Sequence, residues 1–177
     1  MAQIALSRQK TDETVIADSL LQAFLDAPSV TVHAWHPPSA KTYFGPLVRI
    51  PRKSFGARTR DRYHLDGIVQ IQNFLMLVEL KGDSSGLATD VEKLKELMSA
   101  YDLRELKGLL ESRVHDRSAL ATVNAWCPMF GYLRDKGSEP QTGVVVKMSD
   151  PGDRLIASIH DDVDPRLKKL LKVIFEP

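Results

Sequence analysis

The segment from Phe74 to Lys81, FLMLVELK, limits the fold of this chain more than any other part of it. It is apolar for most of its length, which is typical of a strand buried on both faces of a sheet. A second β-like run extends from Tyr63 to Ile71, and only the polar pair Gln72-Asn73 lies between the two runs. This spacing predicts a tight antiparallel hairpin in the core of the protein, with its turn at Gln72-Asn73.

Residue patterns on both sides of this hairpin predict helices and further strands. Apolar residues recur at helical spacing from Thr11 to Ala27, and Pro28 ends that helix. Prolines break the region from Ser29 to Arg62, so we expect a connecting segment there, with short edge-strand pieces at most. The elements expected after the hairpin are a helix capped by Thr89 or Asp90 that continues toward Leu110 after a break near Ser99, a core strand from Ala119 to Cys127 ended by Pro128, a hairpin of Gly143 to Met148 with Arg154 to His160, and a closing helix from Pro165 to Phe175.

This order of elements predicts a single domain, residues 1–177, of the mixed α/β class. Strands on both sides of the helix near Thr89 favour a crossover connection between them. Hydrophobic residues at 43% and charged residues at 27% are ordinary for a globular protein of 177 residues. The composition therefore excludes a chain that is disordered as a whole.

The cysteine content and the N-terminal region indicate the compartment. Cys127 is the only cysteine, so it cannot form an internal disulfide or a cysteine-based zinc site. The residues from Met1 to Lys10 do not resemble a signal peptide. The sequence also has no run of about 20 apolar residues, the length that spans a bilayer. We therefore expect a soluble, cytoplasmic protein.

Three polar residues of the predicted hairpin, Asp66, Glu79 and Lys81, form the strongest candidate site. Glu79 and Lys81 are two residues apart on one strand, so their side chains project from the same face. Asp66 lies six residues before Gln72 and Glu79 six residues after Asn73, so the hairpin places the two acids side by side. Two adjacent carboxylates repel each other unless a cation lies between them, and hard oxygen ligands favour Mg²⁺ or Mn²⁺. With a lysine beside such a metal, the set suits metal-assisted hydrolysis of a phosphodiester bond.

The stretch from Tyr63 to Gly82, YHLDGIVQIQNFLMLVELKG, resembles the PD-(D/E)XK nuclease superfamily, whose members have a restriction-endonuclease-like fold. The motif of that superfamily is an Asp, a spacer, and Glu-x-Lys on the next strand, which corresponds here to Asp66 and Glu79-Leu80-Lys81. Its core of helix, three-stranded meander, helix and strand follows the order expected above. The resemblance implies that Asp66 and Glu79 bind Mg²⁺ or Mn²⁺, with the Leu80 backbone carbonyl as a third ligand, and that Lys81 assists the attacking water.

The implied activity is that of a metal-dependent endonuclease, a phosphodiesterase of the hydrolase class. Many members of the superfamily add a metal-binding acid from the first helix, which here is Glu13, with Asp18 as the alternative. The resemblance favours DNA over RNA, although the residues themselves do not separate the two. A homodimer is open, and so is a catalytically inactive nuclease-fold module that binds nucleic acid or a protein partner.

A basic segment lies immediately before the candidate metal site. Between residues 49 and 62, six basic residues stand against Asp61 alone, a net charge of +5 in a chain whose overall charge is +1. Such a segment suits contact with a nucleic-acid backbone, although charge runs are also common in solvated loops. The candidate nucleic-acid-binding residues are Arg49, Arg52, Lys53, Arg58, Arg60 and Arg62.

Two other groups of polar residues receive structural interpretations. His33 and His36 have a spacing seen in metal sites, but the two prolines that follow prevent the helix that would align them. Lys93 and Lys95 lie on the helix after the motif, where we expect them to form a solvated face with Glu92 and Glu96; contact with phosphates is the weaker alternative.

Overall fold

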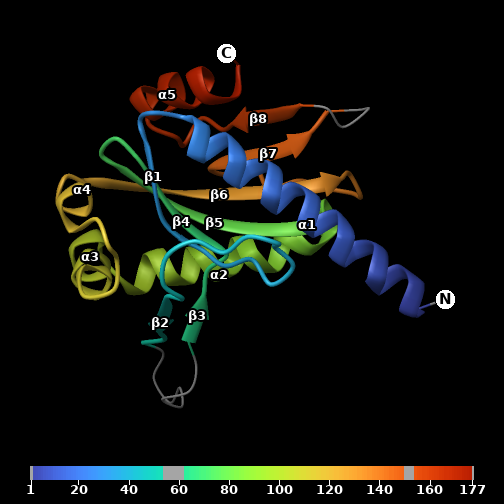
Figure 1. Cartoon of the computed structure of the whole chain (residues 1–177), viewed down its shortest axis with the longest axis horizontal. Helices are drawn as coiled ribbons and strands as arrows, with labels where there is room; N and C mark the ends of the chain where they lie inside the picture. The colour runs from blue at the N-terminus through green and yellow to red at the C-terminus, as the bar shows by residue number, and fades with distance from the viewer. Residues whose placement is uncertain (1, 54–61, 150–153, 177) are drawn as a thin grey trace.

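The computed structural model describes residues 2–53, 62–149 and 154–176 and has the mixed α/β architecture expected from the sequence. Six strands form one mixed sheet in the order β1-β4-β5-β6-β7-β8 (Figure 1). The β5/β6 and β6/β7 pairs are parallel, and the other pairs are antiparallel. The strands of this sheet are β1 (Val30–Trp35), β4 (Gly67–Ile71), β5 (Phe74–Asp83), β6 (Ala125–Arg134), β7 (Val144–Met148) and β8 (Leu155–Ile159).

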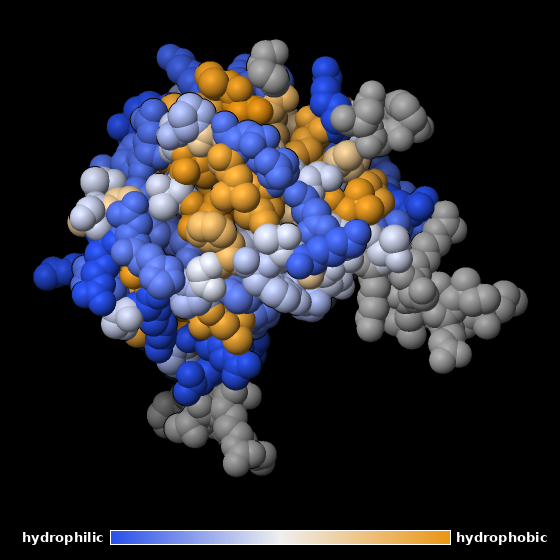
Figure 2. Space-filling model, in the orientation of Figure 1, coloured by the Kyte–Doolittle hydropathy of each residue, from blue (hydrophilic) through white to orange (hydrophobic). Residues whose placement is uncertain are grey.

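Helices cover both faces of the sheet (Figure 1). One face packs against α1 (Ala2–Asp26) and α5 (Pro165–Phe175). The other packs against α2 (Leu87–Ala100), α3 (Leu103–Glu111) and α4 (Arg117–Ala121). Figure 2 shows hydrophobic side chains gathered over α1 and α5, where Leu25 is 49% and Val173 is 74% exposed.

Strand β5 forms the centre of both hydrophobic layers, as the FLMLVELK run predicts. Met76 and Val78 pack with α1 and α5, while Leu75 and Leu77 pack with α2 and its neighbours. All four side chains are fully buried. Because alternate side chains of a strand point to opposite faces, an apolar run without alternation is what a central strand of a three-layer fold requires.

The predicted hairpin is confirmed for β4 and β5, which pair from Ile71↔Phe74 to Gly67↔Val78. The turn is formed by Gln72 and Asn73, with Gln72 at a φ of 52°. The preceding strand is shorter than predicted, because the chain leaves the sheet at Asp66. Residues before it form β3 (Arg62–His64), which pairs with β2 (Arg49–Pro51) in a separate two-stranded ribbon.

The region expected to be a connecting segment contains a strand of the main sheet. Strand β1 pairs antiparallel with β4, and its residues from Val32 to Trp35 are buried. The prolines at positions 37 and 38 come only after this strand, so they end it rather than prevent it. Gly67 leaves room for the Trp35 ring, since a Cβ at that glycine would lie 2.6 Å from it.

The strand predicted from Ala119 to Cys127 is wrong in position. Asp116 accepts a hydrogen bond from the Ala119 amide and caps α4, so the first part of that segment is helical. Strand β6 begins at Ala125 and passes through Pro128 without ending there. Pairing of β6 with β7 starts only at Met129, so at Pro128 the strand has a single neighbour and the missing N–H disrupts no ladder on the other side.

The remaining predicted elements are present with shifts at their ends. Strands β7 and β8 form the second hairpin, and α5 has the predicted bounds, with Asp164 as its N-cap. Helix α2 is capped by Gly86 rather than by Thr89 or Asp90. A capping box at Asp102 starts α3 and explains the break after α2. Within the described residues, no helix has the length and apolar character needed to cross a membrane.

Candidate active site

Asp66 and Glu79 face each other at the open end of the β4–β5 hairpin. Asp66 directly precedes β4, and continuing the Gly67↔Val78 register by one position sets it opposite Glu79. Asp66 is 5% and Glu79 is 2% exposed. The Leu80 N–H donates a hydrogen bond of 2.7 Å to Asp66 Oδ2. The hairpin thus places two buried carboxyl groups together, as the residue count around its turn predicts.

Burial is the main cause of a raised pKa at both carboxyl groups. At Glu79 the negative charge of Asp66 raises the pKa further. At Asp66 the hydrogen bond from Leu80 opposes the shift, because it stabilises the charged form. Two carboxylates in this position are costly to ionise, and a bound cation would remove that cost.

Lys81 lies two residues beyond Glu79 and is half-buried. Its side chain passes over Gly86, where a Cβ would lie 3.2 Å from Lys81 Cγ. The Lys81 Nζ lies 3.8 Å from Oδ2 of Asp90, a residue of α2 that is 5% exposed. That distance is too long for a hydrogen bond, and Asp90 Oδ2 is a buried oxygen without a hydrogen-bond partner. The site therefore includes a third acid, on the helix that follows the motif.

Lys93 enters the same site and does not belong to the solvated face predicted for it. Its side chain is 21% exposed, and its Nζ lies 2.7 Å from Glu79 Oε1 and 3.9 Å from Asp90 Oδ1. The Nζ also donates a 3.0 Å hydrogen bond to the His64 carbonyl at the end of β3. Lys93 is thus the closest positive charge to Glu79 among the ion pairs that the described residues form.

The sequence carries a signal for these two residues. Asp90 lies on the same stripe of α2 as the buried residues Leu87, Leu94 and Leu97. A charged residue within the apolar stripe of a helix points toward the core and needs a partner there. Lys93 is one turn further on, where an i,i+3 neighbour can supply that partner.

Glu13, the predicted acid of the first helix, faces this site from α1. It is half-buried, and its pKa is raised by burial first and then by the negative charge of Asp66. The alternative, Asp18, accepts a 3.2 Å hydrogen bond from the Lys41 amide instead. The Leu80 carbonyl points to the same side of β5 as its N–H, which is the side where β4 has ended. Both additional ligands proposed for the metal are thus directed toward Asp66.

The donor set fits a hard divalent cation in its chemistry, since it consists of carboxylate and carbonyl oxygens. The unpartnered Asp90 Oδ2 and the raised pKa values of the buried Asp66 and Glu79 agree with such a cation. In the part of the chain that the structure describes, however, no three His, Cys, Asp or Glu residues are gathered with metal-site geometry.

The predicted nucleic-acid contacts lie on the β2–β3 ribbon, which projects away from the main sheet (Figure 1). Arg49, Arg52, Lys53 and Arg62 are exposed on it, and Arg58 and Arg60 lie outside the described residues. The Arg52 guanidinium stacks over the Tyr63 ring at 4.8 Å, and Lys53 forms an ion pair with Glu105. Strand β3 leads directly to Asp66, so the exposed basic residues are adjacent in the chain to the buried acids.

The two histidines with metal-like spacing do not converge. His33 is buried, and its Nε2 lies 2.7 Å from Gln70 Oε1. His36 Nε2 lies 2.8 Å from the Gly45 carbonyl, and its ring stacks on Tyr43. Their structural interpretation agrees with these contacts.

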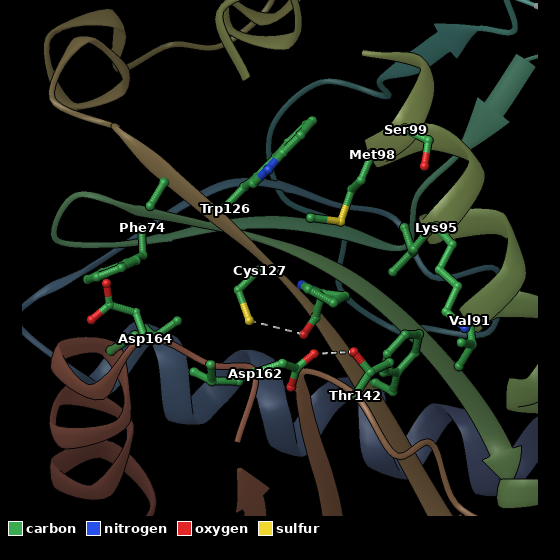
Figure 3. A pocket seen from close by; sticks show the side chains of 16 residues that line it. Phe74, Val91, Lys95, Met98, Ser99, Trp126, Cys127, Thr142, Asp162 and Asp164 are labelled. Carbon is green, nitrogen blue, oxygen red and sulfur yellow. Dashed lines mark hydrogen bonds between the residues drawn. The ribbon is translucent and has the colours of Figure 1, made fainter. Parts of the chain in front are cut away.

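A groove of about 520 Å³ lies between α2 and the segment that leads into α5 (Figure 3). Trp126 and Cys127 of β6 line it together with Met98 of α2. Burial raises the pKa of the Cys127 thiol to about 12, so the thiol is not activated as a nucleophile. Asp66, Glu79 and Lys81 are not among the described residues that line the groove, which therefore takes no part in the candidate chemistry.

Comparisons of the chain with protein-family models, with curated proteins and with solved structures gave no match.

Proposed function

We propose that this protein is a metal-dependent nuclease of the restriction-endonuclease-like type, which hydrolyses phosphodiester bonds in DNA. The observation that supports this proposal most is a pair of buried carboxyl groups. Asp66 and Glu79 face each other at the open end of a hairpin, and Lys81 follows Glu79 by two residues. Burial raises the pKa of both acids, an arrangement that disfavours their charged forms and is expected at functional sites rather than in structural cores.

The order of elements supports the proposed fold type. Helix α1 is followed by the antiparallel strands β1, β4 and β5, then by the helices α2, α3 and α4, and then by β6 parallel to β5. This is the order of helix, meander, helix and strand that the resemblance implies. The β2–β3 ribbon is inserted between the first and second strands of the meander, just before Asp66.

In the proposed reaction Asp66 and Glu79 hold Mg²⁺ or Mn²⁺, and the Leu80 carbonyl and Glu13 complete the ligand set. When bound, the metal activates water and neutralises charge on the phosphate. Lys81 directs the water toward phosphorus and stabilises the negative charge that grows on the phosphate as the P–O bond to the leaving group breaks. The Lys81 side chain is 36% exposed and its stem passes over Gly86, so its ammonium is open to solvent, as this role requires.

The basic ribbon supplies the proposed contact to the nucleic-acid backbone. Arg49 and Arg62 lie on neighbouring strands of the ribbon and are exposed. Arginine side chains on such a projecting element neutralise phosphates and release their counterions. DNA remains the proposed substrate class because the motif resembles a family that acts mainly on DNA.

The test is cleavage of plasmid DNA, single-stranded DNA and RNA with Mg²⁺, with Mn²⁺ and with EDTA. We expect Asp66→Asn and Lys81→Met to lower the rate at least about 100-fold, since each removes a group that acts in the transition state. The matched controls Glu92→Gln and Lys95→Met change exposed residues of α2 and should retain the wild-type rate. Cleavage that survives both site substitutions contradicts the proposal. Tight binding without cleavage under every condition supports the inactive nuclease-fold module instead.

A further inference from the structure

Lys93 is a half-buried cation that the proposed hydrolysis does not use. Its Nζ lies 2.7 Å from Glu79 Oε1, 3.9 Å from Asp90 Oδ1 and 3.0 Å from the His64 carbonyl oxygen. These three contacts come from β5, α2 and the end of β3, so the ammonium joins all three elements at the edge of the site.

We propose that Lys93 is a built-in counter-ion that occupies Glu79 in the metal-free protein and is displaced from it when the divalent cation binds. This inference rests on the proposed function, because it names the residue that competes with the metal of that same site. It makes metal binding an exchange of one cation for another rather than the filling of a preformed cage.

The competition follows from the contacts of Glu79. The carboxyl group that would bind the metal, Glu79, is the group that Lys93 contacts, at Oε1. An ammonium and a divalent cation on one carboxylate repel each other, and this repulsion is weakly screened at a residue that is 2% exposed. The two cations therefore exclude each other from Glu79.

Asp90 gives the second, independent observation. Its side chain is 7% exposed, and its Oδ2 lacks a hydrogen-bond partner although Lys81 and Lys93 are both within 4 Å of the carboxylate. Neither ammonium comes within hydrogen-bond distance of Asp90, so this acid is under-compensated. Once released from Glu79, Lys93 can move onto Asp90 while it retains the His64 carbonyl, so the displaced ammonium has a place to go.

The alternative is that Lys93 is a fixed structural counter-ion that stays on Glu79 with or without metal. The two roles make opposite predictions for metal affinity. A displaceable competitor weakens metal binding, so its removal strengthens it. A fixed partner holds Glu79 in place, so its removal weakens metal binding or leaves it unchanged.

The experiment measures Mn²⁺ binding to the full chain by electron paramagnetic resonance and isothermal titration calorimetry, without nucleic acid. We expect Lys93→Met to bind Mn²⁺ about tenfold more tightly than the wild type, because it keeps the apolar stem and removes the competing charge. Lys95→Met, on the exposed side of the same helix, should leave the affinity unchanged. Lys81→Met tests the effect of charge without contact to Glu79 and should strengthen binding less than Lys93→Met does.

The outcomes separate this inference from the proposed function. If the wild type binds Mn²⁺ and Lys93→Met binds no more tightly, or if Lys81→Met strengthens binding equally, the exchange is wrong and the metal site stands. If neither the wild type nor Lys93→Met binds Mn²⁺, the metal-dependent function itself is wrong, and the exchange with it. Circular dichroism verifies that the variants are folded. If Lys93→Met does not fold, Lys93→Gln replaces it, because glutamine can still donate a hydrogen bond to the His64 carbonyl.

Discussion

Both ends of the β4–β5 hairpin bury polar side chains, but these side chains have many hydrogen-bond partners at one end and few at the other. At the turn end, Gln70 is 3% exposed, and its Nε2 lies within 3.0 Å of the Gln72 carbonyl, the Ala119 carbonyl and Thr122 Oγ1. Its Oε1 lies 2.7 Å from His33 Nε2. At the open end, Asp66 and Glu79 share one hydrogen bond from Leu80 and one ion pair with Lys93.

The difference separates a structural cluster from a functional one. A neutral amide with all its groups bonded fixes β1, β4 and α4 relative to one another at little electrostatic cost. Buried acids with too few partners destabilise the fold, and such groups persist where they are used in chemistry. We therefore expect substitutions at the open end to lower cleavage and leave stability intact, and substitutions at the turn end to lower stability and leave cleavage intact.

The largest expected effect is on cleavage, at the open end. Glu79→Gln keeps the shape of the side chain but removes its charge, so it should lower the cleavage rate by about 10² to 10⁴-fold through loss of metal binding. In EDTA the same variant should be as stable as the wild type or more stable, because burying the carboxyl group is unfavourable and Lys93 keeps its contacts with Asp90 and the His64 carbonyl. Plasmid cleavage and urea unfolding measure the two quantities. A large loss of stability would mean that Glu79 is a structural residue like Gln70.

The largest expected effect on stability comes from the turn end. Gln70→Ala leaves His33 Nε2 without its partner and removes the bonds from Gln70 Nε2 to the Gln72 and Ala119 carbonyls, so it should lower the free energy of unfolding by about 2–4 kcal/mol. Cleavage per folded molecule should not change. The matched control is Gln22→Ala on the exposed side of α1, where only a bond to Asp26 is lost and a change within about 0.5 kcal/mol is expected. A cleavage defect in folded Gln70→Ala would contradict the separation of the two ends.

The open end could be predicted from the sequence because its geometry is local. A two-residue turn fixes the register of a hairpin, so counting outward from Gln72-Asn73 is enough to set Asp66 against Glu79. The long apolar run of β5 likewise predicts a central strand. The metal-binding role of the pair remains a prediction.

The elements that sequence reasoning missed depend on partners far away in the chain. Strand β1 is stabilised by pairing with β4, which follows the whole β2–β3 ribbon, and the prolines after β1 obscure its pattern. Strand β6 pairs with β5 across three intervening helices, so its start could not be read from a local turn. Charge pairs within its own helix predict a surface position for Lys93, whereas its contact with Glu79 arises only when α2 packs on the sheet.

The dependence of stability on pH gives a third, smaller effect. The ordinary pKa values are 3.8 for Asp66 and 4.5 for Glu79, and burial raises both in the folded state. Above these ordinary values the unfolded chain has released protons that the folded protein still holds, so a rise in pH favours unfolding. The contribution of these two acids to stability is therefore fully present below about pH 4. It is lost as the pH rises through their raised folded-state pKa values, by at most about 1.4 kcal/mol per pH unit for each proton.

Measurement against Glu79→Gln isolates this contribution from the other titrating groups. In EDTA, the stability of Glu79→Gln relative to the wild type should grow as the pH rises above 4.5, the ordinary pKa of Glu79. Saturating Mg²⁺ should reduce that difference, because the cation binds the ionised wild-type site. A difference in stability that stays constant with pH would show that folding does not raise the pKa of the Glu79 carboxyl group.

The smallest expected effect concerns the ribbon attached to the open end. Arg62 is exposed on β3, four residues before Asp66, and Arg62→Gln should weaken DNA binding a few-fold at low salt. The slope of log affinity against log salt concentration should fall by about 0.9 for the loss of one phosphate contact. The control Arg117→Gln removes an exposed arginine beside the turn end, at the start of α4, and should leave the slope unchanged. A DNA backbone that reaches Asp66 must also pass the ribbon. Equal slopes for the two variants would therefore mean that DNA does not bind preferentially at the open end of the hairpin.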